Sequence, residues 1–360
     1  MSKKIGYIYN KMLAKEVIES ALIRASKHKK KRRQVRKALE NKEQTIKDIQ
    51  KILLDESFVP QAPFEKTIWD TSSGKERHVA YVRFFPDAII HTLIVERLEE
   101  IFSPRFDPHS CSAIPKRGGA AAKKYVEKAI QEDAEHTKYC LKLDISKYFQ
   151  SIDKDVLMKQ LHHIIKDKRF LKICSDIINS YIENPEQPEK GIAIGFFPSQ
   201  WFGNSYLTDL DRYIRTLKGV HYYCRYMDDM VLFSDNKEDL HQAKELIESF
   251  LNSFLKLKLK SNYQLFPIDK RPLDFVGYIF YRKYIILRRK TANKTIKQSR
   301  RIYKMQNNNN PIDFHNASGF LSRSGQCKHF NSRLFSKRYV NNINLENLKG
   351  VVKNEGLRKR

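Results

Sequence analysis

Two consecutive aspartates interrupt an apolar stretch in the second half of the chain. Residues 224–233 read Cys-Arg-Tyr-Met-Asp-Asp-Met-Val-Leu-Phe, so Asp228 and Asp229 lie between segments that favour β-strands. Burying two adjacent carboxylates is costly, because each loses hydration and each repels the other. A bound cation would remove that cost. The pattern therefore indicates a β-hairpin over 221–234 that holds a cation, and a surface turn containing Asp-Asp is the alternative.

A further carboxylate ends an apolar run upstream. Residues 139–144 read Tyr-Cys-Leu-Lys-Leu-Asp, which predicts a buried strand ending at Asp144. Phosphoryl transfer by two metal ions needs carboxylates from separate strands that meet at one point, with the ions about 3.5–4 Å apart. Asp144 and Asp228 suit that arrangement. Taken alone, Asp144 could instead cap the turn that follows it.

The charge balance favours a polyanionic partner. The 360 residues include 68 Lys and Arg against 41 Asp and Glu, a formal net charge of +27. Nucleic acid fits this charge best, and a solvated Lys-rich surface is the alternative. With 41% hydrophobic residues, the chain is long enough for a large core divided among two or three subdomains.

The cysteine pattern and the hydropathy of the chain indicate its cellular compartment. The five cysteines are scattered and form no C-x-x-C pair, which argues against a disulfide framework or a structural zinc site. The N-terminus has no apolar signal segment, and no stretch of about 18 apolar residues occurs. We therefore expect a cytoplasmic protein that is neither secreted nor membrane-spanning.

Periodicity predicts an α+β sheet domain, with helices on one face of the sheet, between two basic helical segments. We divide the chain into a basic helical extension (1–55), a central sheet domain (56–284) and a basic helical C-terminal segment (285–360). Helices are expected over 87–102, 120–132, 153–166, 169–183 and 198–215 and in the segment after 240, a hairpin over 64–85, and a strand over 255–260. The N-terminal helices carry a run of basic residues that could contact phosphates or form a solvated face. This run includes Lys29, Lys30, Lys31, Arg32 and Arg33.

The two carboxylate motifs, in this order and separated by helices, resemble those of reverse transcriptases. Asp144 with Phe149 looks like motif A, and the Tyr-Met-Asp-Asp of residues 226–229 looks like the Y-x-D-D box of motif C. Between them, residues 191–200 (Gly-Ile-Ala-Ile-Gly-Phe-Phe-Pro-Ser-Gln) resemble motif B, which supports the templating base and the incoming nucleotide. Alone, that segment would be an ordinary glycine loop before a helix.

Two later segments extend the resemblance. Residues 273–278 (Leu-Asp-Phe-Val-Gly-Tyr) are similar to the primer grip of the same family, and Lys258 or Lys260 falls where motif D places a basic residue. Out of context, the first is a strand with a turn glycine and the lysines are a solvated strand face.

The predicted hairpin around Ser72-Ser73-Gly74-Lys75 resembles the fingers hairpin whose basic residues grip the triphosphate, with an ordinary charged turn as the alternative. The family often shows Asp-Arg shortly after this hairpin, whereas this chain has Asp87-Ala88. That departure leaves the usual arginine contact unassigned, and Arg83 is a weak substitute.

The resemblance covers residues 50–345. It implies a right-hand polymerase, with fingers, an antiparallel palm sheet backed by helices, and a helical thumb that clamps the duplex. It implies an RNA-directed DNA polymerase that uses two Mg²⁺ ions, for which Mn²⁺ can substitute, together with an RNA template, a DNA or RNA primer and dNTPs. The implied site residues are Asp144, Asp228 and Asp229 (catalytic and metal-binding), Lys75, Arg77, Phe149, Gly195, Ser199, Gln200, Tyr226 and Met227 (nucleotide-binding), and Phe275, Val276 and Gly277 (primer grip).

Phe149 bears on the sugar that is selected. A bulky ring five residues after Asp144 would fill the space needed by a ribose 2′-hydroxyl, whereas RNA-synthesising relatives usually carry a smaller or polar residue there. Deoxyribose is therefore expected. A plain core aromatic is the alternative.

The subtype is less constrained. Ile-Gly at 194–195 and Ser-Gln at 199–200 look like enzymes of diversity-generating retroelements and like some phage-defence reverse transcriptases, which use a dedicated non-coding RNA or polymerise without conventional templating. An RNA-dependent RNA polymerase and a catalytically silent RNA-binding scaffold are the remaining alternatives. An accessory protein or a second copy of the chain could take part. A frayed, solvated chain end is expected for the last residues, 357–360.

Overall fold

A computed structural model of the chain describes residues 4–70, 74–327 and 333–357. Within these residues, the centre of the fold is a four-stranded antiparallel sheet in the order β4-β5-β3-β6. β3 lies inside this sheet and is paired along both edges. The strands are β3 (Tyr139–Asp144), β4 (Tyr222–Tyr226), β5 (Asp229–Ser234) and β6 (Gln264–Pro267).

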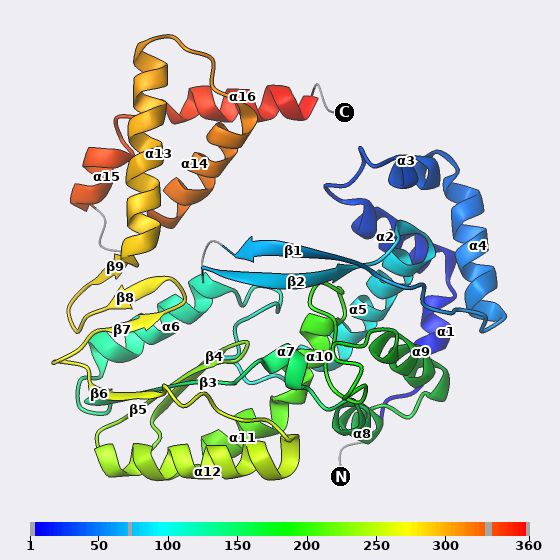
Figure 1. The fold of residues 1–360 in the computed structure, drawn as a ribbon, viewed down its shortest axis with the longest axis horizontal. Coiled ribbons are helices and arrows are strands. Elements are labelled where there is room, and N and C mark those ends of the chain that lie inside the picture. The colour runs from blue at the N-terminus through cyan, green and yellow to red at the C-terminus, as the bar shows by residue number, and fades with distance from the viewer. Residues whose placement is uncertain (1–3, 71–73, 328–332, 358–360) are drawn as a thin grey trace.

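Both faces of the central sheet are covered, which explains why its strands read as nearly continuous apolar runs. Successive side chains in a strand point to opposite faces. Leu141 and Leu143 belong to one hydrophobic core, and Cys140 and Phe233 to another. On the first side, α12 (Lys237–Leu255) packs against β3 and β5, and on the second side α6 (Gly119–Glu132) packs against β4 (Figure 1). The expectation that helices cover one face only was therefore wrong.

The first core continues into the N-terminal helices. α2 packs against α4 and α5, and α1 contacts α9. The N-terminal segment is helical, as predicted. The helices of this region are α1 (Ile8–Met12), α2 (Lys15–Ser26), α3 (Arg33–Glu40), α4 (Lys42–Leu54), η1 (Phe84–Ala88), α5 (Ile89–Phe102), α8 (Lys154–Ile164) and α9 (Lys168–Asn179).

A long hairpin extends from these helices and runs above the central sheet in Figure 1. β1 (Phe64–Asp70) pairs antiparallel with β2 (Lys75–Tyr81), in register from Phe64 opposite Tyr81 to Asp70 opposite Lys75. The predicted hairpin is confirmed, although Ser72 and Ser73 at its tip lie outside the described residues.

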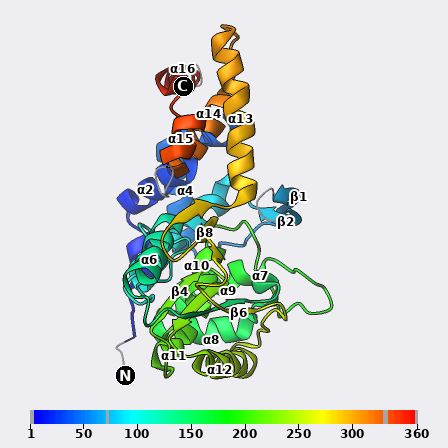
Figure 2. The ribbon, with the colours of Figure 1, turned by 90° about the vertical axis from the view of Figure 1, so that its left-hand side faces the viewer.

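A second sheet joins the central sheet to the C-terminal helices. β7 (Leu273–Phe275), β8 (Tyr278–Phe280) and β9 (Ile285–Leu287) form an antiparallel sheet that shares a core with α6. α13 (Arg289–Asn307) then rises away from the sheets (Figure 2). It packs against α14 (Phe314–Gln326) and α15 (Arg333–Tyr339), and α14 packs against α16 (Leu345–Leu357). Within the described ranges, the helices are too short or too polar to cross a bilayer.

Three local predictions differ from the structure. The basic run around Lys29–Arg33 lies in the turn between α2 and α3, except for Arg33, which begins α3. The helix expected over 198–215 divides into α10 (Ser199–Tyr206) and α11 (Thr208–Thr216) at Leu207.

The strand expected over 255–260 was also wrong, because Leu255 ends α12 and Lys256 caps that helix in the left-handed conformation. Residues 257–260 run alongside β3 with one isolated bridge, between Ile145 and Leu259.

Candidate active site

The pairing of β3 with β5 brings the predicted aspartates together. Asp144, the last residue of β3, lies directly opposite Asp229, the first residue of β5. Residues that face each other in this way have Cα atoms about 4.5–5.5 Å apart. Asp228 occupies the turn between β4 and β5, next to Met227, whose φ of 58° is left-handed. Three carboxylates from two stretches distant in sequence therefore gather at one end of the sheet.

The environment of these carboxylates disfavours their charged forms. Burial raises the pKa of Asp228 to about 7, and the negative charges of Asp144 and Asp229 add to that shift. Burial likewise raises the pKa of Asp229, an effect that the cation of Lys142 opposes. Nζ of Lys260 lies 2.5 Å from Oδ2 of Asp144. The raised pKa values mean that the neighbouring cations do not balance these carboxylates.

The donor set fits a hard divalent cation that shares its coordination with a phosphate. Among the residues described, no three His, Cys, Asp or Glu side chains form a ready-made metal cage. Mg²⁺ is, however, usually held by one or two carboxylates together with substrate phosphates and water. Oδ1 of Asp144 is buried without a hydrogen-bond partner, and it lies beside the carboxylates of Asp228 and Asp229. These oxygens are suitable ligands for such an ion.

A buried ion pair supports the aspartate turn from beneath. Arg225 and Asp211 are both fully buried, and the guanidinium donates to the two carboxylate oxygens from Nε and Nη2 at 2.7 and 2.6 Å. Nη1 of Arg225 donates to the carbonyl of Met227 at 2.9 Å. The hydroxyls of Tyr223 and Ser110 also donate to Asp211. The sequence-based predictions did not include this network, although an arginine inside an apolar strand was a signal of it.

Phe149 lies in α7 (Tyr148–Ser151), the short helix after β3, and its ring packs against α10. An added Cβ on Gly203 would lie 3.3 Å from the ring of Phe149. The neighbouring Tyr148 hydroxyl donates to the carbonyl of Gly203 at 2.5 Å. The ring of Phe149 is half-buried, so one side remains available at the site.

The loop before α10 contacts the hairpin. Gly195 has a φ of +113°, and an added Cβ would lie 2.6 Å from Cγ1 of Val79 in β2. The backbone N–H of Ala80 donates to the carbonyl of Ile194 at 2.8 Å. Ser199 begins α10 and is buried, whereas Gln200 is exposed. The loop and the fingers-like hairpin are thereby fixed to each other.

The basic residues of the hairpin lie at different positions along it. Lys75 and Arg77 are exposed on β2 near the tip. Arg83 lies at the base, where its guanidinium stacks over the ring of Phe64 at 5.1 Å. Lys75 and Arg77 thus occupy the part of the hairpin that reaches furthest over the sheet, and Arg83 does not.

The predicted primer-grip residues form the tight turn between β7 and β8. Val276 and Gly277 have φ values of 43° and 89°, as a two-residue hairpin turn requires. Phe275 is fully buried. Nζ of Lys142, in β3, donates to the carbonyl of Asp274 at 2.8 Å, which ties this turn to the strand that carries Asp144.

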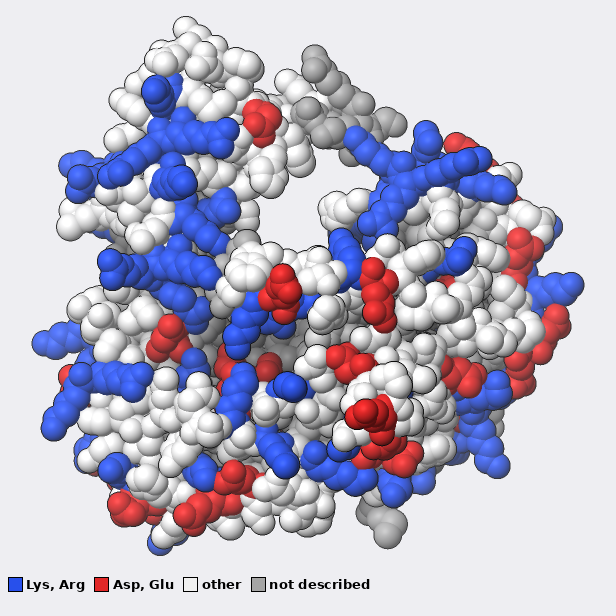
Figure 3. Space-filling model, in the orientation of Figure 1, with Lys and Arg blue, Asp and Glu red and all other residues white. Residues whose placement is uncertain are grey.

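Basic side chains border a hollow above the central sheet. Figure 3 shows Lys and Arg side chains over the α13 side and over the α2–α3 side, with acidic side chains between them. Lys29, Lys30, Lys31, Arg32 and Arg33 are all exposed, in the turn at the upper right of Figure 1. They lie away from the three aspartates, which the sequence alone did not reveal. Tyr226, the last residue of β4, lies opposite Asp229 and is half-buried against the core on the sheet's second face.

The sequence matches a known family over most of the sheet domain. Residues 73–280, more than half of the chain, match the family model described as "Reverse transcriptase (RNA-dependent DNA polymerase)". The curated Protein YkfC of Escherichia coli (strain K12) is 23% identical over 257 residues, which cover 61% of this chain and 67% of that protein.

Solved structures are similar to this chain at low sequence identity. Apo telomerase from Candida tropicalis matches with a TM-score of 0.51 and 12% identity, over 72% of this chain and 52% of that one. Telomerase from Candida albicans with a fragment of telomeric RNA matches with a TM-score of 0.49 and 13% identity, over 84% of this chain and 56% of that one. The chain spans about half the length of these telomerase chains. The predicted fold, an α+β right-hand polymerase, is confirmed.

Proposed function

This chain belongs to the reverse transcriptase family, and on that premise we propose that it is an RNA-directed DNA polymerase that extends a primer on an RNA template. One observation carries the proposal: Asp144 at the end of β3 lies opposite Asp229, beside Asp228 in the neighbouring turn. Carboxylates from separate strands at one point are what two-metal phosphoryl transfer requires.

Asp144, Asp228 and Asp229 would hold two Mg²⁺ ions, for which Mn²⁺ can substitute. When bound, such ions activate the primer 3′-hydroxyl and neutralise the departing pyrophosphate. Lys260 is the basic residue of motif D that we favour over Lys258, because its ammonium lies 2.5 Å from Asp144. The ammonium of Lys260 pairs with Asp144 before a nucleotide binds, and its side chain can then turn toward the incoming phosphate. It therefore has an anionic partner in both states.

The nucleotide would lie between the hairpin and α10. Lys75 and Arg77 would contact its triphosphate, the loop around Gly195, with Ser199 and Gln200, would support its base, and Phe149 would exclude a ribose 2′-hydroxyl. This arrangement favours dNTPs over NTPs. Tyr226 and Met227 complete the floor of the nucleotide site, and Phe275, Val276 and Gly277 would hold the primer end.

For the biological role, we propose a cytoplasmic enzyme of a bacterial retroelement of the diversity-generating type, with a structured non-coding RNA as the template. Support comes from the Ile-Gly and Ser-Gln pairs at 194–195 and 199–200. Sequencing of the RNA that copurifies with the protein tests this role. A repeat-derived template RNA supports it, and a dedicated RNA from a defence locus contradicts it.

The activity is tested by primer extension on a primed RNA template with dNTPs or NTPs. Wild type is expected to incorporate dNTPs. Asp228→Asn is expected to abolish extension while RNA binding remains, because the basic surface supplies most of the affinity. Extension by Asp228→Asn, or preferential use of NTPs by wild type, would contradict the proposal.

A further inference from the structure

A cavity of about 950 Å³ opens on the α12 side of the central sheet, and none of the three aspartates lines it. Its walls come from the end of α5 and from α8, α10, α11 and α12. The volume is at the upper end of the range of about 300–1,000 Å³ typical of ligand sites. Such a space could accept a segment of a larger molecule.

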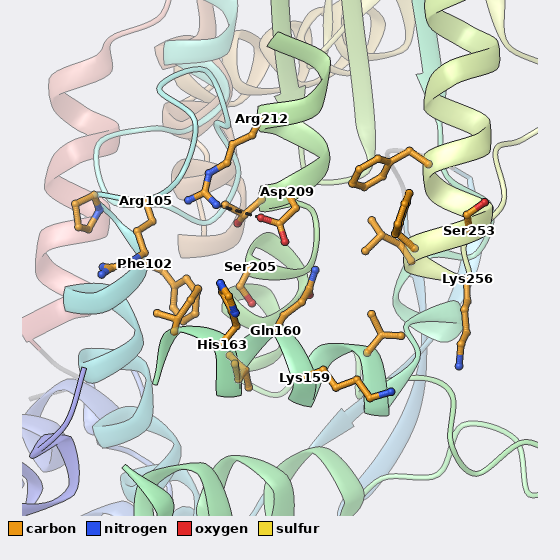
Figure 4. A pocket seen from close by; sticks show the side chains of 18 residues that line it. Phe102, Arg105, Lys159, Gln160, His163, Ser205, Asp209, Arg212, Ser253 and Lys256 are labelled. Atoms are coloured by element: carbon orange, nitrogen blue, oxygen red, sulfur yellow. Dashed lines mark hydrogen bonds and ion pairs between the residues drawn. The ribbon is translucent and has the colours of Figure 1, made fainter. Parts of the chain in front are cut away.

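Basic side chains dominate the charged groups of this cavity. Figure 4 shows Arg105 on one side of it, Lys159 and Lys256 on the other, and Gln160 and His163 between them on α8. Asp209 is the acidic residue of the lining, and its carboxylate pairs with Arg212 at 3.1 Å. Lys256 pairs with Asp153 at 2.6 Å. Lys159 is exposed and makes no ion pair within the described part of the chain. An anionic ligand therefore matches the cavity.

Aromatic rings form the wall on α12. Phe254 is 66% exposed, a large fraction for a phenylalanine on a helix. Its ring centroid lies 5.0 Å from that of Phe250, which stacks on Tyr213 at 4.9 Å. The rings of Phe254 and Phe250 line the cavity, the ring of Tyr213 lies behind that of Phe250, and the outermost ring, that of Phe254, has an open face.

Gln160 of α8 also lines the cavity, and its side chain carries an unpartnered acceptor. Nε2 of Gln160 donates to the carbonyl of Tyr206 at 3.2 Å, but its Oε1 is buried and has no hydrogen-bond partner. Because Oε1 is enclosed, a ligand would reach it only after the Gln160 side chain turns toward the cavity, where an exocyclic amine of a nucleobase is a donor of the right kind. Cations for phosphates, an open aromatic face for stacking and an amide for a base edge are together the means by which proteins bind unpaired RNA.

We propose that this cavity binds a single-stranded segment of RNA outside the polymerase cleft. In this arrangement Phe254 stacks on a base, and Lys159 and Arg105 contact phosphates. The inference rests on the proposed function for the source of the RNA, which would be a part of the template molecule that is not being copied. Because the cavity lies on the opposite side of the sheet from the hollow in Figure 3, one RNA could occupy both places and remain anchored while its template region moves.

The test measures binding of a fluorescein-labelled single-stranded RNA of about twelve nucleotides by anisotropy, after the cleft has been filled with an unlabelled primer–template. Lys159→Glu and Phe254→Ala are each expected to weaken binding by about tenfold. The matched controls are Lys218→Glu, an exposed lysine beyond the far end of α11, and Leu54→Ala, an exposed apolar residue at the end of α4. Both controls should bind as wild type does. Unchanged thermal unfolding midpoints confirm that the exposed substitutions leave the fold intact.

Equal binding by the cavity variants and their controls would overturn the proposal. The proposal would also be overturned if the cavity variants lost binding to polyglutamate but kept RNA binding, because that result would identify an acidic protein as the occupant of the cavity. Primer extension by wild type is a separate readout. If extension fails while the cavity variants lose RNA binding, the proposed function fails and the RNA site stands.

Discussion

Arg225 holds the turn that carries the paired aspartates. Its pair with Asp211 is completely buried, and removing one partner of such a pair leaves an uncompensated charge, at a cost of about 3–5 kcal/mol. We expect Arg225→Met to lower the free energy of unfolding by about this amount in urea titrations. We also expect it to impair primer extension, because the carbonyl of Met227 loses its donor.

The double variant Arg225→Met/Asp211→Leu separates these two effects. It removes both charges, so part of the lost stability should return, but extension should stay low because the carbonyl of Met227 is still unsupported. A double variant no more stable than the single one would contradict the role of the ion pair. Restored extension would contradict the role of Arg225 in the turn.

His91 makes stability depend on pH. The residue is buried in α5, both ring nitrogens lack hydrogen-bond partners, and burial lowers its pKa to about 3 from an ordinary value of about 6.5. Between these two values the unfolded chain binds a proton that the folded chain does not. Stability from this residue is therefore lost as pH falls below 6.5, by about 2 kcal/mol from pH 7 to pH 5.

The variant His91→Leu removes this dependence. Urea unfolding at pH 7 and pH 5 should show that the stability of His91→Leu relative to wild type rises by about 2 kcal/mol at the lower pH. His162→Gln, on the exposed side of α8, is the control and should follow wild type. A constant difference between His91→Leu and wild type at the two pH values would show that His91 is protonated in the folded protein.

The residues that could be predicted from sequence are those whose burial is costly without a ligand. Asp228 and Asp229 stand out because acidic groups inside an apolar hairpin require a physical reason. Arg225 has an equally costly burial, but its partner Asp211 is on a helix whose contact with β4 appears only in three dimensions. A single buried charge can be noticed in a sequence, whereas the identity of its partner cannot.

At the scale of elements, the loop before α10 is held against β2 by a close backbone approach. Gly195→Ala would place a Cβ against the carbonyl of Ala80 and 2.6 Å from Val79, at a φ of +113°. We expect a loss of about 2–4 kcal/mol in unfolding free energy and a raised KM for dNTPs in primer extension. Gly277→Ala is the matched control, because its φ is +89° and nothing lies within 4 Å of the added Cβ. It should cost only about 1 kcal/mol, and similar losses at both positions would show that the contact with β2 is unimportant.

Most elements could be predicted because their periodicity and their caps agree. The helices expected over 153–166 and 169–183 begin after Asp153 and Asp167, whose side chains accept from backbone N–H groups of the first turn. The prediction of a strand over 255–260 was wrong because alternation of Leu and Lys also fits an extended segment that follows a helix. Leu257 is buried in such a segment without a ladder of hydrogen bonds. Alternation of polar and apolar residues indicates which face of a segment is buried, but it does not indicate whether the segment pairs with a β-strand.

At the scale of the whole molecule, the net charge of +27 predicts a polyanionic partner but not where it lies. Three groups of exposed cations lie on the α13 side of the hollow, in the turn between α2 and α3, and around the cavity beneath the sheet. These segments are far apart in sequence. Only the fold decides that two of them border one hollow and that the third lies on the opposite side.

The cations of α13 border the hollow, so their contribution to nucleic-acid binding should appear as salt dependence. Each phosphate contact contributes about 0.7–0.9 to the slope of log K against log salt concentration. Lys297, Arg300 and Lys304 are exposed on α13, and replacing all three with Gln should reduce the slope for an RNA–DNA primer–template by about 2. The control replaces Lys172, Lys218 and Lys237, which are exposed on other elements, and keeps the net charge equal between the two variants. Anisotropy titrations over a series of salt concentrations measure both slopes. If the two variants reduce the slope equally, the duplex responds to total charge alone and α13 does not contact it.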